Sequence, residues 1–133
     1  DDHEVVRKGI KILLEDDGNI QVVAEASDGV EAIERIGDTQ PDLLITDIRM
    51  PGMDGLQTTQ AVKEQFPKVK ILVLSMHEDE EYIMKSVEFG ADCYLLKVTC
   101  KPEFVNAIVV VMSCLKYFSG DISNILVNSY LCA

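Results

Sequence analysis

The sequence contains no tryptophan, and its four cysteines match no common cofactor motif. Neither a paired metal-ligand spacing nor a C-x-x-C pair occurs among Cys93, Cys100, Cys114 and Cys132. This spacing argues against a zinc site and against a thioredoxin-like redox site. We interpret the four side chains as reduced thiols of a cytoplasmic protein.

Basic residues and long apolar runs are also scarce. Lys and Arg total 12 against 23 Asp and Glu, which gives a formal net charge of −11. Such a charge argues against sequence-independent nucleic-acid binding by this chain, because phosphate neutralisation needs clustered cations. No apolar run reaches the length of about 18 residues that a membrane-spanning helix needs. The 133 residues, 47% of them hydrophobic, predict one globular core instead.

Apolar runs typical of buried strands alternate with segments of helical periodicity. Strands are predicted at 20–24, 43–45, 71–74 and 93–96, and helices at about 2–15, 28–36 (ending near Gly37), 54–66, 79–89 and 102–118. Uninterrupted apolar strands between helices are typical of a parallel sheet covered on both faces. The sequence therefore predicts an α/β fold with a doubly wound parallel sheet.

Reactive polar residues close the predicted strands. Asp47, Ser75 and Lys97 each follow an apolar run, and ligands of open α/β sheets bind beyond these strand ends. Asp1 and Asp2 precede the first helix, where another strand would end at the same edge. Three clustered carboxylates favour a hard cation, so we expect Mg²⁺ or Mn²⁺ here.

This combination of groups predicts phosphoryl transfer. A carboxylate in line with a phosphodonor can act as the nucleophile when a metal and a lysine neutralise the developing charge. Asp47 is the predicted nucleophile and Lys97 the predicted cation. Ser75 would donate its hydroxyl to the transferred group.

Four motifs together resemble response-regulator receiver domains of two-component systems, and most closely the NarL/LuxR-type subfamily. They are DDH at 1–3, LITDIRMPGMDG at 44–55, LS at 74–75 and GADCYLLK at 90–97. The resemblance implies a flavodoxin-like (βα)5 fold over residues 1–118, lacking its first strand. Residues 119–133 resemble a tail or linker toward an output domain that is absent from this chain.

By this resemblance, Asp47 is the phosphoacceptor and Lys97 contacts the phosphoryl oxygens. The implied metal ligands are the side chains of Asp2 and Asp47, Asp1 through water, and the backbone carbonyl of Arg49. The domain is thus a phosphoacceptor that assists its own phosphorylation and dephosphorylation, and is not a conventional enzyme.

The resemblance also implies a switch and a set of rate-modulating positions. Ser75 and Tyr94 match the hydroxyl and aromatic switch positions, where phosphorylation draws the hydroxyl and then the ring inward. Simple packing is the alternative interpretation of Tyr94. Arg49, Met76 and His77 flank the expected phosphoryl group and would set its rate of hydrolysis.

The implied partners are a sensor histidine kinase and the chain's own output domain, which we expect to be a DNA-binding transcription regulator. The helix at 102–118 has almost no polar face. It would be either a core helix or, as we favour, a surface for a homodimer or for the output domain. No nucleic acid or membrane contact is expected of this chain.

One departure from the family pattern and two alternative functions remain to be considered. The chain begins at its acidic pair, so the central first strand is missing, and 125–127 with 130–131 could fill that slot. A pseudo-receiver that binds proteins without being phosphorylated is one alternative function, which the intact acceptor, acids and lysine argue against. An aspartyl-phosphate phosphatase is another, but it needs a second acid two residues after Asp47, where this chain has Arg49.

Overall fold

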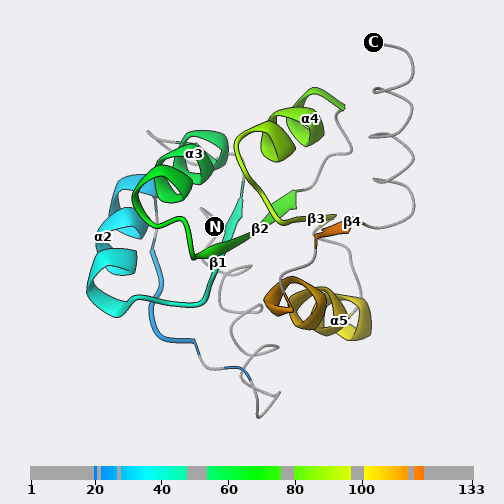
Figure 1. Ribbon diagram of the computed structural model, residues 1–133, viewed down its shortest axis with the longest axis horizontal. Helices are drawn as coiled ribbons and strands as arrows, with labels where there is room; N and C mark the ends of the chain where they lie inside the picture. Colours follow the sequence, from blue (N-terminus) through cyan, green and yellow to red (C-terminus); the bar gives the residue numbers. More distant parts are fainter. Residues whose placement is uncertain are drawn as a thin grey trace.

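The computed structural model describes residues 20, 22–26, 28–47, 54–75, 80–96, 101–113 and 116–118. Helices and strands alternate through these residues and stack in three layers (Figure 1). In chain order, the elements are α2 (Gly29–Thr39), β1 (Leu43–Asp47), α3 (Gly55–Gln65), β2 (Lys70–Ser75), α4 (Glu80–Glu88), β3 (Cys93–Leu96), α5 (Lys101–Met112) and β4 (Tyr117–Phe118). The α/β fold with a parallel sheet, predicted from the alternation, is confirmed.

The strands of the described region form one parallel sheet in the order β1-β2-β3-β4. Leu43 pairs with Lys70 at the start of β1, and Asp47 pairs with Leu74 at its end. In β2, Ser75 pairs with Leu96 of β3. We call the edge where β1, β2 and β3 end the carboxyl edge and the edge where they begin the amino edge.

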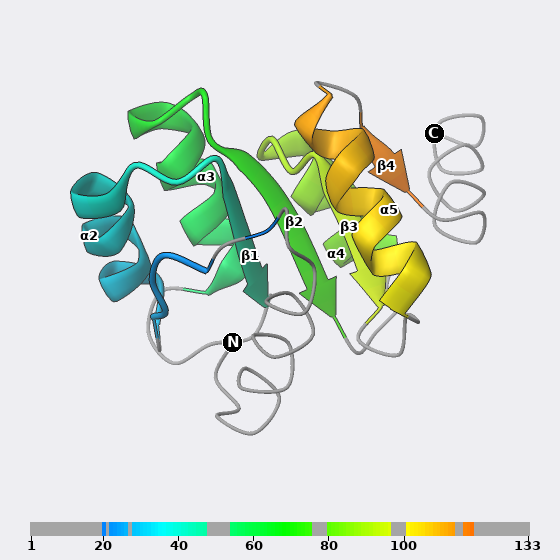
Figure 2. The same ribbon diagram turned by 90° about the horizontal axis from the view of Figure 1, so that it is seen from below.

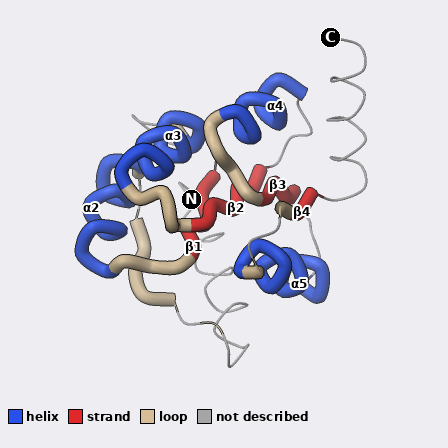
Figure 3. Tube along the Cα trace, in the orientation of Figure 1, coloured by secondary structure: helices blue, strands red, loops and turns tan. Residues whose placement is uncertain are grey.

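Two apolar clusters lie on opposite faces of the sheet. Alternate residues of β2 supply both, because successive side chains of a strand point to opposite faces. One cluster joins Ile71 and Val73 to α2, α3 and α4, and the other joins Leu72 and Leu74 to α5. Figure 3 shows the strands in a row between α3 and α4 on one side and α5 on the other.

Helix α2 begins where the sequence predicts but ends later. Asp28 caps it by accepting a hydrogen bond from the Glu31 N–H at 2.8 Å. The predicted end near Gly37 is wrong, since the helix continues to Thr39 and Gln40 adopts the left-handed conformation, with φ 48°. The Gln40 N–H still donates to the Ile36 carbonyl at 2.8 Å, so Gly37 remains inside the hydrogen-bonded helix.

The end of the last predicted helix also needs correction. α5 ends at Met112 rather than near Phe118, and residues Tyr117–Phe118 form β4 beside β3. Ser113 closes α5, its N–H reaching the Val109 carbonyl at 3.2 Å and its hydroxyl the same carbonyl at 3.0 Å. Local apolarity does not reveal this end, because the strand exists through its pairing with β3.

The strand predicted at 20–24 is not found among its described residues, which adopt neither helix nor strand. Ile20 and Val22 pack instead against the cluster beneath α5, whereas Val23 is 50% exposed. The side chains of Ile20 and Val22 are therefore partly buried without sheet pairing, so a short apolar run is here not evidence of a strand. The helix predicted at about 2–15 and the tail strands proposed at 125–127 and 130–131 lie outside the described residues.

No helix in the described ranges is long and apolar enough to cross a membrane. The longest apolar helix, α5, has 12 residues.

Candidate functional site

Asp47 lies at the carboxyl edge, at the last position of β1, and only 6% of it is exposed. Its register partner in β2 is Leu74, so Ser75 lies one residue further along the neighbouring strand. Adjacent strands are about 4.8 Å apart. The fold therefore brings two of the predicted site residues, Asp47 and Ser75, to neighbouring strand ends.

Polar contacts fix the end of β1 and the start of α3. At the end of β1, the buried Thr46 hydroxyl donates to the Asp47 carbonyl oxygen at 3.0 Å. At the start of α3, Asp54 caps the helix by accepting from the Gln57 N–H at 2.8 Å, and Gln57 Oε1 accepts from the Asp54 N–H at 3.0 Å. This capping box fixes the start of α3.

Ser75 ends β2 and is 2% exposed. Its register partner is Leu96, the last residue of β3. Lys97 follows Leu96 directly in the sequence but lies outside the described residues. The register thus supports the predicted neighbourhood of Ser75 and Lys97, while the placement of the lysine side chain stays a prediction.

Tyr94 is fully buried in β3, opposite Val73 in the register. It belongs to the cluster formed with α2, α3 and α4, which includes Ile83 of α4. Ser75 lies two residues after Val73 in β2 and therefore points to the same face of the sheet. Both switch candidates, Ser75 and Tyr94, thus face this side. The burial of Tyr94 agrees with simple packing. A switch would also need Tyr94 on the same face of the sheet as Ser75, so the two interpretations stay open.

Six predicted site residues lie outside the described ranges: Asp1, Asp2, Arg49, Met76, His77 and Lys97. Within the described ranges, no three His, Cys, Asp or Glu side chains gather as a metal site. Of the predicted metal ligands, Asp47 is the one within the described ranges, and its buried carboxylate at the strand end is chemically suited to Mg²⁺.

The amino edge holds a second buried aspartate, to which the sequence analysis gave no role. Asp92 Oδ2 accepts from Lys63 Nζ at 2.9 Å and from the Ile71 N–H at 3.0 Å. Lys116 Nζ lies 3.6 Å from Asp92 Oδ1. Burial alone would raise the pKa of Asp92, but these hydrogen bonds and the charges of Lys63 and Lys116 outweigh it and hold that pKa below its ordinary value.

The sequence contains the residues of this network, but Asp92 lies inside a segment that resembles a receiver motif, so the sequence pattern does not identify the network. Asp92 lies immediately before the strand Cys93–Leu96, within the segment 90–97 that we had compared with receiver motifs. Lys63 lies in α3, 29 residues earlier in the sequence, and α4 comes between the two residues along the chain. No local sequence pattern therefore connects the two side chains. The network ties α3, β2 and β3 together.

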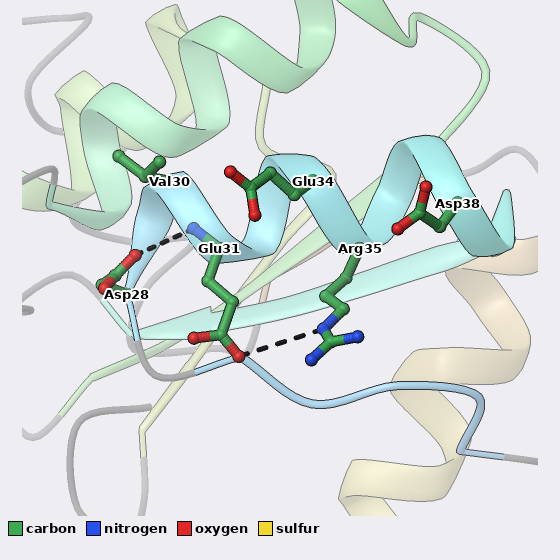
Figure 4. Close-up of a pocket in the computed structure, with 6 residues that line it drawn as sticks. All are labelled: Asp28, Val30, Glu31, Glu34, Arg35 and Asp38. Atoms are coloured by element: carbon green, nitrogen blue, oxygen red, sulfur yellow. Dashed lines mark hydrogen bonds and ion pairs between the residues drawn. The ribbon is translucent and has the colours of Figure 1, made fainter.

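Other chemically notable groups have structural explanations. Burial raises the pKa of the Cys93 thiol to about 12, so this free cysteine stays protonated and is unsuited to nucleophilic chemistry. An open hollow runs along α2 (Figure 4). Among its lining residues, Asp28 caps the helix and Arg35 pairs with Glu31 at 3.9 Å.

Comparisons with known proteins agree with this geometry. The response regulator receiver domain family matches residues 1–109. The oxygen regulatory protein NreC of Staphylococcus epidermidis is 39% identical over 132 residues, which are 98% of this chain and 61% of NreC. This chain therefore spans less than two thirds of that relative's length.

Two solved structures show the same fold. A LuxR-family two-component response regulator from Aurantimonas matches with a TM-score of 0.92 and 31% identity, over 98% of this chain and 94% of that chain. RcsB, solved as two dimers bound to two parallel DNAs, matches with a TM-score of 0.86 and 27% identity, over 95% of this chain and 64% of that chain.

Proposed function

Because this chain belongs to the response regulator receiver-domain family, we propose that Asp47 accepts a phosphoryl group from a sensor histidine kinase. The observation that carries the proposal is the position of Asp47, buried at the carboxyl edge beside the end of β2. Receiver domains are signalling domains rather than conventional enzymes. The transfer would set the state of an output domain.

The chemistry requires little of the protein beyond position and charge. A carboxylate oxygen of Asp47 forms a bond to phosphorus, and the bond from phosphorus to the imidazole nitrogen of the phosphohistidine breaks. The leaving imidazole keeps the electron pair of that bond and takes up a proton. The side chains of Asp2 and Asp47, Asp1 through water and the Arg49 carbonyl would hold Mg²⁺, which would supply positive charge to the phosphoryl oxygens.

In the sequence, the other predicted site residues lie at or close to the ends of neighbouring strands, and each has a role in the same reaction. Lys97 neutralises a phosphoryl oxygen, and the Ser75 hydroxyl donates a hydrogen bond to the same group. Tyr94, on the same side of the sheet as Ser75, responds by the position of its ring. Arg49, Met76 and His77 set the hydrolysis rate of the phosphoaspartate, which the domain assists.

We assign the output to a DNA-binding transcription regulator attached beyond residue 118, with 1–118 as the receiver and 119–133 as the tail or linker. RcsB, which shares the fold, is known bound to DNA. The net charge of −11 assigns DNA contact to that other domain rather than to these residues. A kinase and a DNA target both place the protein in the cytoplasm.

Helix α5 supplies the surface for a homodimer. Val109 is 59% exposed and Met112 41%, while Val105 lies half-buried on the same face, at a spacing of three and four residues. No charged residue occurs from 104 to 113. An exposed apolar stripe of this kind favours an apolar partner, and a second copy supplies the identical stripe.

The first test of phosphorylation is the intact mass of the full chain after incubation with Mg²⁺ and acetyl phosphate. We expect one phosphoryl adduct, which is lost in Asp47→Asn and in the presence of EDTA. Asp38→Asn, an exposed aspartate of α2, is the matched control and should keep the adduct. A folded wild-type chain that gains no adduct would support the pseudo-receiver alternative.

The dimer is tested by sedimentation of the phosphorylated chain. We expect Val109→Glu to make the dimer dissociate, because it places a charge in the apolar stripe. Glu34→Lys on α2 changes the charge elsewhere on the surface and should leave the dimer intact. A monomer at all concentrations for the wild type would reassign the stripe to the output domain.

A further inference from the structure

Strand β4 shares its contacts with the predicted switch residue. It is only two residues long, and its pairs in β3 are Cys93 with Tyr117 and Tyr94 with Phe118. Phe118 also packs, half-buried, against the apolar cluster that contains Tyr94. The backbone of Tyr94, whose ring is the predicted switch, therefore pairs with β4.

The connection that leads to β4 has an unusual handedness. Moving across the sheet from β1 to β4, the chain crosses through α3 and α4 on one face but through α5 on the other. In Figure 2 the strands run downward, α5 lies in front and each later strand lies further to the right. The first two crossovers are thus right-handed and the last is left-handed, a hand found in only about 2% of parallel crossovers.

Polar contacts fasten the beginning of β4 at the amino edge. Lys116, the residue before β4, donates from Nζ to the Ala91 carbonyl at 3.4 Å and lies 3.6 Å from Asp92 Oδ1. Asp92 is itself held firmly by Lys63 at 2.9 Å. The Lys116 side chain is 56% exposed against 21% for Lys63, so the contact with Lys116 is the weaker and more easily exchanged of the two.

We propose that residues 116–118 form a releasable latch, whose docking on β3 tightens when Asp47 is phosphorylated. The inference rests on the proposed function, since Tyr94 connects the two sites. The structure has the docked arrangement, with the Tyr94 ring fully buried and β4 paired with β3. A phosphoryl group that holds Ser75 and Tyr94 in this position stabilises the surface against which Phe118 packs, and with it the contact of Lys116 with Asp92. The end of β4 at Phe118 is then held in a fixed position, and the state of Asp47 is transmitted through β4.

Because of thermodynamic linkage, the coupling between the two sites can be measured either as docking of β4 or as binding of a phosphoryl analogue at Asp47. If a phosphoryl analogue tightens the docking of β4 by some factor, then weakening the docked state lowers the affinity for the analogue by up to the same factor. A latch held by two residues and one exposed ion pair has a small enough docking free energy to be shifted in this way.

The test measures amide hydrogen exchange at Tyr117 and Phe118 in the full chain, with Mg²⁺ alone and with Mg²⁺ plus beryllium trifluoride. Because consecutive N–H groups of an edge strand point alternately toward and away from the neighbouring strand, we expect exchange at the one of these two amides that faces β3 to slow by at least about tenfold with the analogue. Lys116→Gln should reduce that response and weaken binding of the analogue. Lys116→Arg should preserve both, and Arg35→Gln, which removes an exposed cation on α2, should resemble the wild type.

The outcomes separate the latch from the site on which it depends. If the analogue binds but exchange at 117–118 is unchanged, the latch is wrong and the proposed function stands. The same holds if Lys116→Gln responds no differently from Arg35→Gln. If the analogue does not bind to the folded wild type, the proposed phosphoacceptor function fails, and the latch fails with it.

Discussion

Asp47 and Asp92 are aspartates at opposite edges of one sheet, and their exposures are nearly equal at 6% and 8%. Their surroundings differ in kind. Asp92 accepts from Lys63 and from the Ile71 N–H, with Lys116 close to its other oxygen. Asp47 lies where β1 ends, beside the end of β2, at the edge that binds ligands in open α/β sheets.

The difference shows that burial alone does not identify a reactive carboxylate. Lysines of the fold neutralise Asp92, so its charge is used to join α3, β2 and β3. We propose that the carboxylate of Asp47 serves phosphoryl transfer instead. Replacing aspartate by asparagine should therefore affect phosphorylation at the carboxyl edge and the free energy of unfolding at the amino edge.

The largest expected effect is at the carboxyl edge. Asp47→Asn should abolish the phosphoryl adduct, because the amide is not a nucleophile, while the free energy of unfolding changes by about 1 kcal/mol or less. Intact mass after acetyl phosphate treatment and urea denaturation measure the two quantities. A residual adduct of wild-type size in Asp47→Asn would place the phosphoacceptor elsewhere.

At the amino edge, Asp92→Asn should do the reverse. It removes the charge that pairs with Lys63 and lowers the free energy of unfolding by about 2–3 kcal/mol, the scale of a lost charged hydrogen bond in a buried setting. Urea denaturation gives the loss, and intact mass of the folded protein should show an unchanged adduct. If Asp92→Asn lost the adduct but kept wild-type stability, the contrast between the two edges would be wrong.

The stability difference between wild type and Asp92→Asn should depend on pH in a defined direction. The pKa of Asp92 is lowered from its ordinary value of 3.8, so its contribution is fully present above that value and is lost as pH falls through the folded pKa. The difference should be full at about pH 6 and smaller at about pH 3. Urea denaturation of both proteins at the two pH values measures it. A difference that stays constant would show that Asp92 does not act through its charge.

The smallest effect concerns the glycine beside Lys63. Gly90 has a φ of 104°, and a Cβ there would lie 2.7 Å from Lys63 Cγ. Gly90→Ala should therefore lower the free energy of unfolding by about 1–2 kcal/mol. The control is Gly37→Ala inside α2, where the nearest atom lies 3.8 Å from the added Cβ. Gly37→Ala should raise the free energy of unfolding by about 0.5–1 kcal/mol. Thermal or urea denaturation that gave both changes the same sign would contradict this account.

Much of the fold was predictable because its local signals are strong. The strands Leu43–Asp47, Lys70–Ser75 and Cys93–Leu96 contain the apolar runs that the sequence displays, and Asp54 caps α3 where that helix was expected to begin. The predicted end of α5, by contrast, was wrong. A run of apolar residues continues through 104–112 whether or not the chain then turns back to the sheet, so the pattern has no feature that marks Met112 as the last helical residue.

Part of the candidate site was predictable for the same reason. Asp47 and Ser75 were expected at neighbouring strand ends because each follows an apolar run, and the register confirms that neighbourhood. The roles of these residues, and those of Asp1, Asp2, Arg49, Met76, His77, Tyr94 and Lys97, stay predictions.

The sequence by itself determined the strands Leu43–Asp47, Lys70–Ser75 and Cys93–Leu96 and the polar residues that follow their apolar runs, since both depend on neighbours in the chain. Only the tertiary structure decided the network of Lys63, Asp92 and Lys116 and the docking of Phe118 beside Tyr94. These contacts join residues more than 20 positions apart, and their partners are selected by the packing of helices on the sheet. No periodicity along the chain encodes such a choice, because it becomes defined only once the layers have assembled.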